Sequence, residues 1–400
     1  MILEGIRVLD FTQILAGPTV TRLMAEMGAE IIKIEQAPGG DPSRVLPALK
    51  DGRSGYFIQQ NRGKKSLCLD LTKPESGDIL RALVQKVDVV TENFGPGVME
   101  KRKLDYGSLR EINPRVIMAS ISAFGRASPL SHKTGYDLIA QAFSGIMHVT
   151  GPRGGPPHPV QTGISDVTAG VHAFAALGYA LFHRERTGRG QYIDISMIDV
   201  MFHMHEMNVQ APWITKGAFV PTRMGVHNAL VAPCGAFRGP SGFLVMLVLQ
   251  RQWENLCGAM DRPDLISDPR FAENDARARN QDALISIIET WMAGFETNEE
   301  ILEHFERFRV PSGPVLSPTD AYSHKYFLGR GTVRSTRDPI LGEVMIPGFP
   351  LRLSEQPATP DVPAPLLGQH NRAILEEVLG YSAERIEALV ASGVLVAGDR

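Results

Sequence analysis

The 400-residue sequence has few cysteines and no large excess of charge of either sign. Its three cysteines, Cys68, Cys234 and Cys257, match neither the spacing of a zinc site nor that of a redox CxxC pair. Such a sparse, odd count is typical of a reducing compartment. A net charge of −3 gives no electrostatic basis for general nucleic-acid binding. We therefore expect a reducing environment and no nucleic-acid partner.

The sequence also lacks the patterns that direct a chain to a membrane. Its first residues, MILEGIRVLDF, contain no basic region followed by an apolar core, which disfavours a signal peptide. No uninterrupted apolar run reaches the length of about 18 residues that a membrane span needs. We expect a soluble, cytoplasmic protein with no membrane partner.

Three common nucleotide and nucleophile motifs are missing. No G-x-G-x-x-G follows the first predicted strand, where the sequence is DFTQILAGP, and no G-x-x-x-x-G-K-[ST] is present. Around Ser165 the sequence is GISDV, with Val167 in place of the second glycine of a G-x-S-x-G elbow. These absences disfavour nucleotide oxidoreductases, NTPases and serine hydrolases.

The histidine-rich sequence HMHE at 203–206 has the residue types of a metal site but not its spacing. On a helix, His203 and His205 would lie about 200° apart and could not easily share one ion. We interpret both as packed or surface side chains and expect no metal.

Strand and helix patterns alternate along the first 125 residues. Strands are predicted at 6–11, 29–35, 66–71, 87–90 and 116–122, with helices such as 73–85 between them. This alternation predicts right-handed crossovers and a parallel sheet covered on both faces, an α/β fold. Later segments include an apolar run at 242–249, helices at 283–294 and 299–308, and two final helices at 371–379 and 382–392. A chain of this length predicts two lobes.

The loop TENFGPG at 91–97 directly follows a predicted strand. Ligands gather at the carboxyl ends of strands in an open parallel sheet. Asn93 offers an amide, Phe94 a stacking face, and Lys101 and Arg102 follow as candidate phosphate contacts. An ordinary strand-to-helix turn with a solvated basic patch explains the same residues equally well.

Asp166 lies at the start of a helix predicted over 166–182, in the sequence GISDVTAG. Asp is a favoured helix N-cap, a role worth about 1 kcal/mol, and this role alone could explain it. A carboxylate among glycines that admit a bulky thioester can also act as a nucleophile toward an acyl carbonyl.

Short motifs decide between these interpretations because they recur in order along nearly the whole chain. They are LEGIRVLDF (3–11), AGP (16–18), GAE (28–30), KIE (33–35), GDPSR (40–44), NRGKKS (61–66), ENFGPG (92–97), NPRVI (113–117), GYD (135–137), GISD (163–166), TGRGQ (187–191), LGYS (379–382) and GV (393–394). Together they resemble the class III coenzyme A transferase family, which includes formyl-CoA transferase, carnitine CoA-transferase and α-methylacyl-CoA racemase.

The resemblance implies a Rossmann-like large domain from both ends of the chain, residues 1–205 and 330–400. It also implies a small α+β domain over 215–325 and an interlocked homodimer. The implied activity is transfer of CoA between short carboxylic, or dicarboxylic, acids. Asp166 would carry first a mixed anhydride and then a CoA thioester. The partners would be an acyl-CoA and a free carboxylic acid, and CoA would be a substrate, with no permanently bound cofactor.

The resemblance also implies which residues contact CoA: Gln13, Arg44, Leu69, Thr72, Asn93, Phe94, Lys101 and Tyr136. Lys101 replaces an arginine of formyl-CoA transferase, which keeps the charge but loses the planar fork. Leu15 stands where that enzyme has a glutamine.

Two departures distinguish branches of the family. The racemase branch has a histidine where this chain has Tyr136, whose ordinary pKa near 10 suits α-proton transfer poorly. The oxalate-accepting branch has a glycine run where this chain reads RMGVHN at 223–228. Arg223 and His227 could there meet the distal carboxylate of a diacid. An acyl-CoA racemase and a CoA-binding protein without transferase activity stay open as alternatives.

Overall fold

The computed structural model describes residues 1–356 and 361–398. Two compact units are present. We call them the large unit, made of Met1–Ile146, Val160–Val209 and Tyr322–Arg400, and the small unit, made of Met147–Pro159 and Gln210–Ala321. The segment Met147–Pro159 belongs to the small unit, although the sequence prediction assigned it to the large domain.

The large unit is built on a six-stranded sheet in which every pair of neighbouring strands is parallel. Its strands are β1 (Arg7–Asp10), β2 (Glu30–Gln36), β5 (Lys64–Leu69), β6 (Val89–Glu92), β7 (Ile117–Ser122) and β8 (Tyr192–Ser196). Their spatial order is β5-β2-β1-β6-β7-β8, the doubly wound arrangement in which the order of successive strands reverses between the parallel neighbours β1 and β6. The predicted α/β fold with a parallel sheet is confirmed; β8 was not predicted.

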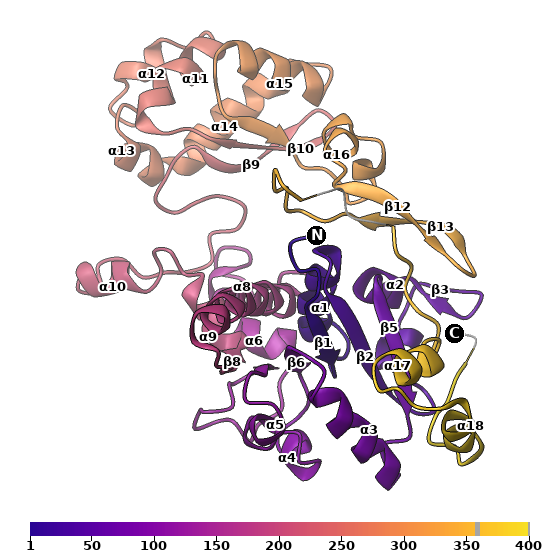
Figure 1. Ribbon diagram of the computed structural model, residues 1–400. Coiled ribbons are helices and arrows are strands. Elements are labelled where there is room, and N and C mark those ends of the chain that lie inside the picture. The colour runs from indigo at the N-terminus through magenta and orange to yellow at the C-terminus, as the bar shows by residue number, and fades with distance from the viewer. Residues whose placement is uncertain (357–360, 399–400) are drawn as a thin grey trace. The chain divides into compact units, whose positions relative to one another are not determined.

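Side chains alternate between the two faces of this sheet, as strand geometry requires. Val8 and Ile31 pack on one face with residues of the helices α1 (Ala16–Glu26) and α8 (Ile164–Thr187). Leu9 and Ile32 pack on the other face. The helices on that face are α3 (Pro74–Val84), α5 (Tyr106–Ile112), α17 (Asn371–Glu377) and α18 (Ala383–Ala391) (Figure 1).

Small residues let α8 lie close to α1. A Cβ on Gly170 would come within 2.6 Å of the Ala16 carbonyl oxygen, so only glycine fits there. Among the described residues, α8 is the one helix long and apolar enough to cross a membrane, and core helices of soluble proteins share these properties. Here its buried side chains are part of the core on one face of the sheet.

The C-terminal segment returns to the edge strand β5. The side chain of Asn371 accepts the Cys68 N–H at 2.9 Å, and the Val394 carbonyl accepts the Asp70 N–H at 2.9 Å. The hairpin of β12 (Val333–Asp338) and β13 (Gly342–Pro347) also belongs to the large unit. The predicted cap at Ser382 is confirmed, because its hydroxyl accepts the Arg385 N–H.

The small unit contains a three-stranded antiparallel sheet of β9 (Cys234–Gly239), β10 (Gly242–Leu247) and β11 (Ser312–Pro314). Helices α11 (Trp253–Ala259), α14 (Gln281–Met292) and α15 (Asn298–Arg307) pack with it around a core that contains Trp253 and Phe305.

The remaining helices of the two units are α2 (Gly55–Asn61), α4 (Val98–Lys101), α6 (Asp137–Phe143), α7 (Ile146–Val149), α9 (Met197–His203), α10 (Gln210–Ile214), α12 (Asp264–Ser267), α13 (Asn274–Arg279) and α16 (Lys325–Gly329). The short strands β3 (Leu49–Lys50) and β4 (Arg53–Ser54) and the 3-10 turns η1 (Pro42–Val45), η2 (Gln250–Gln252) and η3 (Asp320–Tyr322) complete the elements.

Candidate active site

Two loops meet at the carboxyl ends of β1 and β6, where the strand order reverses. The Asn93 side chain joins them, since its Oδ1 accepts the Gln13 N–H at 2.8 Å and its Nδ2 donates to the Gln13 carbonyl at 2.9 Å. In open α/β sheets the crevice at this reversal is the usual ligand site. The structure therefore brings two of the predicted CoA-contacting residues together at the expected edge.

The loop after β1 is strained. Ile14 has a φ of 66°, a left-handed conformation that β-branched residues rarely adopt and that costs on the order of 1–3 kcal/mol. Asp41 supports this conformation by accepting the Ile14 N–H at 3.3 Å, and the buried Lys33 forms an ion pair with Asp41 at 2.8 Å. No sequence pattern indicated this feature, since Ile is an unlikely choice for such a position.

Asp166 lies in the first turn of α8 but is not its N-cap. The helix begins at Ile164, two residues earlier than predicted, so Gly163 occupies the N-cap position and the cap interpretation of Asp166 is wrong. Gly163 also leaves room for the loop after β1: a Cβ on it would lie 2.4 Å from Leu15 Cδ2 and 3.6 Å from Asp166 Oδ2. The Asp166 carboxylate thus lies beside the loop that carries Gln13.

The surroundings of Asp166 disfavour its charge. Burial, and then the nearby carboxylate of Asp137, raise the pKa of Asp166 to about 7. The pKa of Tyr56, in α2, is also raised, to about 12. The causes are burial and then the charges of Asp166, Asp41 and Asp137. A strongly shifted carboxyl group is a feature of many functional sites. The prediction from sequence named neither Tyr56 nor Asp137 as part of the site.

Asp137 and Tyr136 begin α6, whose other end is Phe143. Asp137 Oδ1 accepts the Ser165 N–H at 2.8 Å and the Ser165 hydroxyl at 2.7 Å. Tyr136, a predicted CoA contact, precedes it and is 75% exposed. The GYD and GISD motifs, 28 residues apart, are therefore in direct contact.

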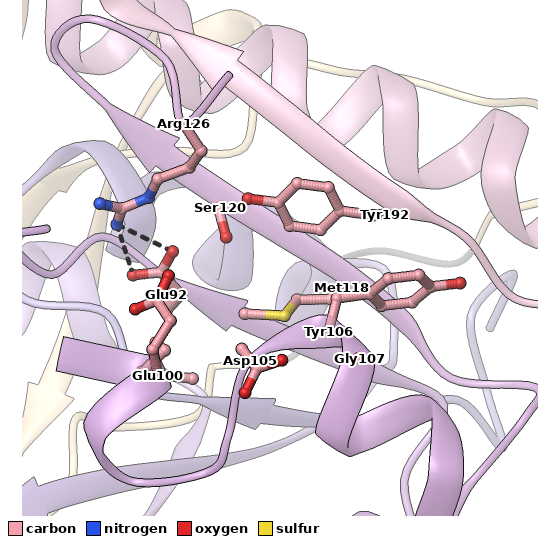
Figure 2. Close-up of a pocket in the computed structure, with 10 residues that line it drawn as sticks. Glu92, Glu100, Asp105, Tyr106, Gly107, Met118, Ser120, Arg126 and Tyr192 are labelled. Atoms are coloured by element: carbon pink, nitrogen blue, oxygen red, sulfur yellow. Dashed lines mark hydrogen bonds and ion pairs between the residues drawn. The ribbon is translucent and has the colours of Figure 1, made fainter. Parts of the chain in front are cut away.

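Arg126 holds the backbone of the loop 91–97, which contains Phe94. Figure 2 shows Arg126 and Glu92 facing each other across one side of a cavity of about 270 Å³. Arg126 Nη2 donates to both Glu92 oxygens at 3.0 Å and to the Phe94 carbonyl at 2.7 Å. Burial raises the pKa of Glu92 although Arg126 favours its charge. The sequence did not indicate Arg126 as a site residue. Its hydrogen bond fixes the backbone of Phe94, which was a predicted CoA contact.

Thr72 and Lys101 line one cavity of about 380 Å³. Its other cationic lining residues are Lys73, Arg81 and Arg102. Asp70 fixes Thr72 by accepting its N–H at 3.0 Å and its hydroxyl at 2.6 Å. A basic cavity of this kind suits a phosphate group.

Arg44 and Leu69 are buried in the large unit. Arg44 forms a two-point ion pair with Glu35, with both N–O distances 2.7 Å, and its guanidinium lies 3.8 Å from the centre of the Phe57 ring. Leu69 ends β5 within the hydrophobic core. Both residues support the sheet edge, and their contact with CoA stays a prediction.

Arg223 and His227 belong to the small unit. Arg223 Nε donates to the Gly155 carbonyl at 2.8 Å, and Nη1 donates to the His148 carbonyl at 2.7 Å. The His227 ring packs on Phe237 with 4.9 Å between ring centres, and burial lowers its pKa. Arg223 therefore holds the loop 148–155, and its predicted contact with a diacid stays a prediction.

The HMHE histidines have packing partners in the structure. The His203 ring lies 6.3 Å from that of His172, and His205 Nε2 lies 3.0 Å from the Ser144 carbonyl oxygen. Within residues 1–356 and 361–398, no group of three or more histidine, cysteine, aspartate or glutamate side chains is arranged to hold a metal ion.

Comparison with known proteins identifies the family. The profile of CoA-transferase family III matches residues 3–371. The chain is 35% identical to a succinyl-CoA:glutarate CoA-transferase of Mus musculus, over 98% of this chain and 90% of the relative. It is 37% identical to a succinyl-CoA:mesaconate CoA-transferase of Haloarcula hispanica, over 96% and 99%. The crystal structure of a CAIB/BAIF family protein from Brucella suis, 31% identical, covers 94% of this chain and 99% of its own with a TM-score of 0.84.

A doubly wound α/β sheet, with a carboxyl group of raised pKa near the loop after β1, is the arrangement expected of a ligand-binding α/β protein. The chain belongs to CoA-transferase family III, and the resemblance deduced from its motifs is confirmed.

Proposed function

We propose that this enzyme transfers CoA from an acyl-CoA of a short dicarboxylic acid to a second carboxylic acid, through intermediates bound to Asp166. The observation that carries the proposal is the Asp166 carboxylate itself, half-buried in the first turn of α8 with its pKa raised to about 7. A poorly solvated carboxylate is a better nucleophile than one in bulk water, and the ionised fraction near neutral pH is large enough to react. The two curated relatives support the substrate class, since succinyl, glutarate and mesaconate groups all carry two carboxyl groups.

Four exchanges at the Asp166 carboxyl account for the transfer. A carboxylate oxygen attacks the donor acyl carbon, its C–S bond breaks, and CoA thiolate and a mixed anhydride form. The thiolate then attacks the Asp166 carbonyl carbon, which releases the donor acid and leaves an aspartyl-CoA thioester. The acceptor carboxylate attacks this thioester and releases the thiolate again. Attack of the thiolate on the acceptor acyl carbon restores Asp166. The acyl group stays activated at every step, as an anhydride or a thioester, provided that water is excluded.

For CoA we propose the crevice between the loops after β1 and β6. Gln13, Asn93 and Phe94 would hold the pantetheine part, because the Asn93 side chain binds the Gln13 backbone and so keeps the two loops together there. Thr72 and Lys101 would meet a phosphate in the basic cavity, and Tyr136 would border the thioester.

We also propose a homodimer. The large unit exposes Phe143 on α6 and Tyr179 and Phe182 on α8, which are 60%, 76% and 60% exposed. Tyr179 and Phe182, together with Met24 and Phe174, line a cavity of about 640 Å³ whose lining is mainly apolar. Exposed apolar side chains that gather in this way support an interface. Light scattering on the wild-type chain should give twice the chain mass, and Phe182→Glu should give the monomer. Val390→Glu, at an exposed apolar position on α18, is the control that should stay dimeric.

Intact mass measurement after incubation with succinyl-CoA tests the mechanism. A protein adduct with the mass of CoA less one water should form on the wild-type chain and be absent from Asp166→Ala. Asp264→Ala removes another carboxylate from the first turn of a helix, α12, and should keep the adduct. If Asp166→Ala transferred CoA as fast as the wild type, the mechanism would be wrong.

The racemase alternative has a separate signature. A racemase would exchange the α-hydrogen of a 2-methylacyl-CoA with deuterium from solvent, whereas a transferase exchanges labelled CoA between two acids. We expect CoA exchange without deuterium incorporation. A CoA-binding protein without activity would show neither.

A further inference from the structure

The first turn of α8 has no cap from its own flanking residues. Gly163 stands at the N-cap position and has no side chain to offer. A larger residue there would collide with Leu15, since a Cβ would lie 2.4 Å from its Cδ2. The first N–H groups of a helix nevertheless need partners, and side chains normally supply them.

Asp137 supplies this partner from another helix. Its Oδ1 accepts both the N–H and the hydroxyl of Ser165, at 2.8 and 2.7 Å. Its Oδ2 accepts a hydrogen bond from Gln141 Nε2 at 2.7 Å. Gln141 is fully buried and is itself tied to Val160, whose N–H donates to Gln141 Oε1 at 2.9 Å. Asp137 therefore joins α6, the loop at Val160 and the start of α8.

We propose that Asp137 is a positioning residue for Asp166: it caps α8 from α6 and thereby fixes the turn from which the Asp166 carboxylate projects. The proposal rests on the assignment of Asp166 as the nucleophile. Ser165, which Asp137 holds by two hydrogen bonds, is the residue directly before Asp166. Reacting groups need positions accurate to well under 1 Å, so a loose first turn would slow the attack.

The negative charge of Asp137 also affects the ionisation of Asp166. Among the described residues, no lysine or arginine forms an ion pair with Asp137, and its negative charge acts on Asp166. Burial raises the pKa of Tyr56, in α2, which lies close enough for the charges of Asp166, Asp41 and Asp137 to raise it further. Helix α9 carries Asp199 in its first turn and His203 in its last. Removal of the Asp137 charge should therefore let Asp166 ionise at lower pH.

Two substitutions separate the capping role from the charge. Asp137→Ala removes the acceptor for Ser165, whereas Asp137→Asn keeps one side-chain oxygen and removes the charge. We expect Asp137→Ala to slow formation of the CoA adduct at least tenfold. Asp137→Asn should restore most of that rate and should lower the pH of half-maximal adduct formation, by about half a unit or more. Ser382→Ala, which removes the cap of α18, should lower Tm without changing the adduct rate or its pH profile.

The outcomes discriminate between the proposals. A wild-type adduct rate and pH profile in both Asp137 variants, with the adduct still absent from Asp166→Ala, would overturn the role of Asp137 and leave that of Asp166 intact. No adduct on the wild-type chain with succinyl-CoA would overturn both. Should Asp137→Ala not fold, the pH profile of Asp137→Asn decides alone, and an unchanged profile contradicts the proposal.

Discussion

The Asn93 side chain closes a ring of two hydrogen bonds with the backbone of Gln13, 80 residues earlier. This contact joins the loops that follow two neighbouring strands at the point where the sheet reverses its order. The contact uses both the donor and the acceptor of the Asn93 side-chain amide. Apart from asparagine, only glutamine carries this pair of groups. The crevice expected to hold CoA is thus shaped by a side chain and not by either loop alone.

Asn93→Ala should loosen this crevice. It leaves the Gln13 N–H and carbonyl without partners, which costs about 1–3 kcal/mol in the free energy of unfolding. We expect a several-fold increase in KM for the acyl-CoA, measured by steady-state kinetics beside urea unfolding. Asn113→Ala is the matched control, because Asn113 Nδ2 also donates to two backbone carbonyls, those of Val84 and Val87. It should cost similar stability and leave KM unchanged; a rise in KM for both variants would contradict the assignment.

The strands near this crevice could be predicted because their apolar runs are short and uniform. Residues 29–35 and 116–122, for example, become β2 and β7 with boundaries within one residue. The edge strand β8 was missed because its sequence, YIDIS, is half polar. Asp194 within it accepts the backbone N–H groups of Arg126 and Ala127, which a pattern search for buried strands cannot indicate.

The candidate active site was predicted less completely, and the reason is physical. Asp166 and Asn93 lie in motifs that carry their own signal. Asp137 also lies in a motif, GYD, but its role depends on its contact with Ser165, which is distant in sequence. Tyr56 and Ile14 likewise acquire their roles through distant neighbours, Tyr56 through the charge of Asp166 and Ile14 through Asp41. A sequence contains no distances between such residues.

Asp166→Asn should stabilise the protein at high pH only. The pKa of Asp166 is raised from 3.8 to about 7, so the folded state favours the protonated form. Its stabilising effect is fully present below pH 4 and is lost as the pH rises toward 7, where ionisation costs about 2–4 kcal/mol. We expect urea unfolding to show a more stable Asp166→Asn variant at pH 8 and little difference near pH 4.

A carboxylate with the opposite shift provides the control. Burial opposes the charge of Asp338, but hydrogen bonds from Arg53 hold its pKa below the usual value. Such a group stabilises the folded state above its unfolded pKa and loses this effect as the pH falls. Asp338→Asn should therefore destabilise the protein at pH 8. A loss of stability at pH 8 in Asp166→Asn as well would mean that Asp166 is not held in an unfavourable environment.

Lys101→Ala tests the basic cavity. If Lys101 meets a phosphate of CoA, its loss should raise KM for the acyl-CoA by about three- to tenfold, as expected for one charged contact. The effect should shrink at high salt, because an exposed charge pair is screened. Lys86→Ala removes an exposed lysine that follows α3 and does not line this cavity. Equal effects of the two substitutions would show that the cavity has no part in binding.

Arg223→Ala tests recognition of the second carboxylate of a diacid. Arg223 Nε and Nη1 donate to the Gly155 and His148 carbonyls, which fixes the plane of the guanidinium group. A fixed guanidinium can pair with a carboxylate at little further cost in side-chain entropy. We expect its loss to raise KM for succinate and glutarate more than for a monoacid such as butyrate, by about fivefold or more. Arg153→Ala, which removes a half-exposed arginine from the loop that Arg223 holds, is the control and should change neither. If Arg223→Ala impaired mono- and diacids equally, Arg223 would support the loop alone and the diacid would be recognised elsewhere.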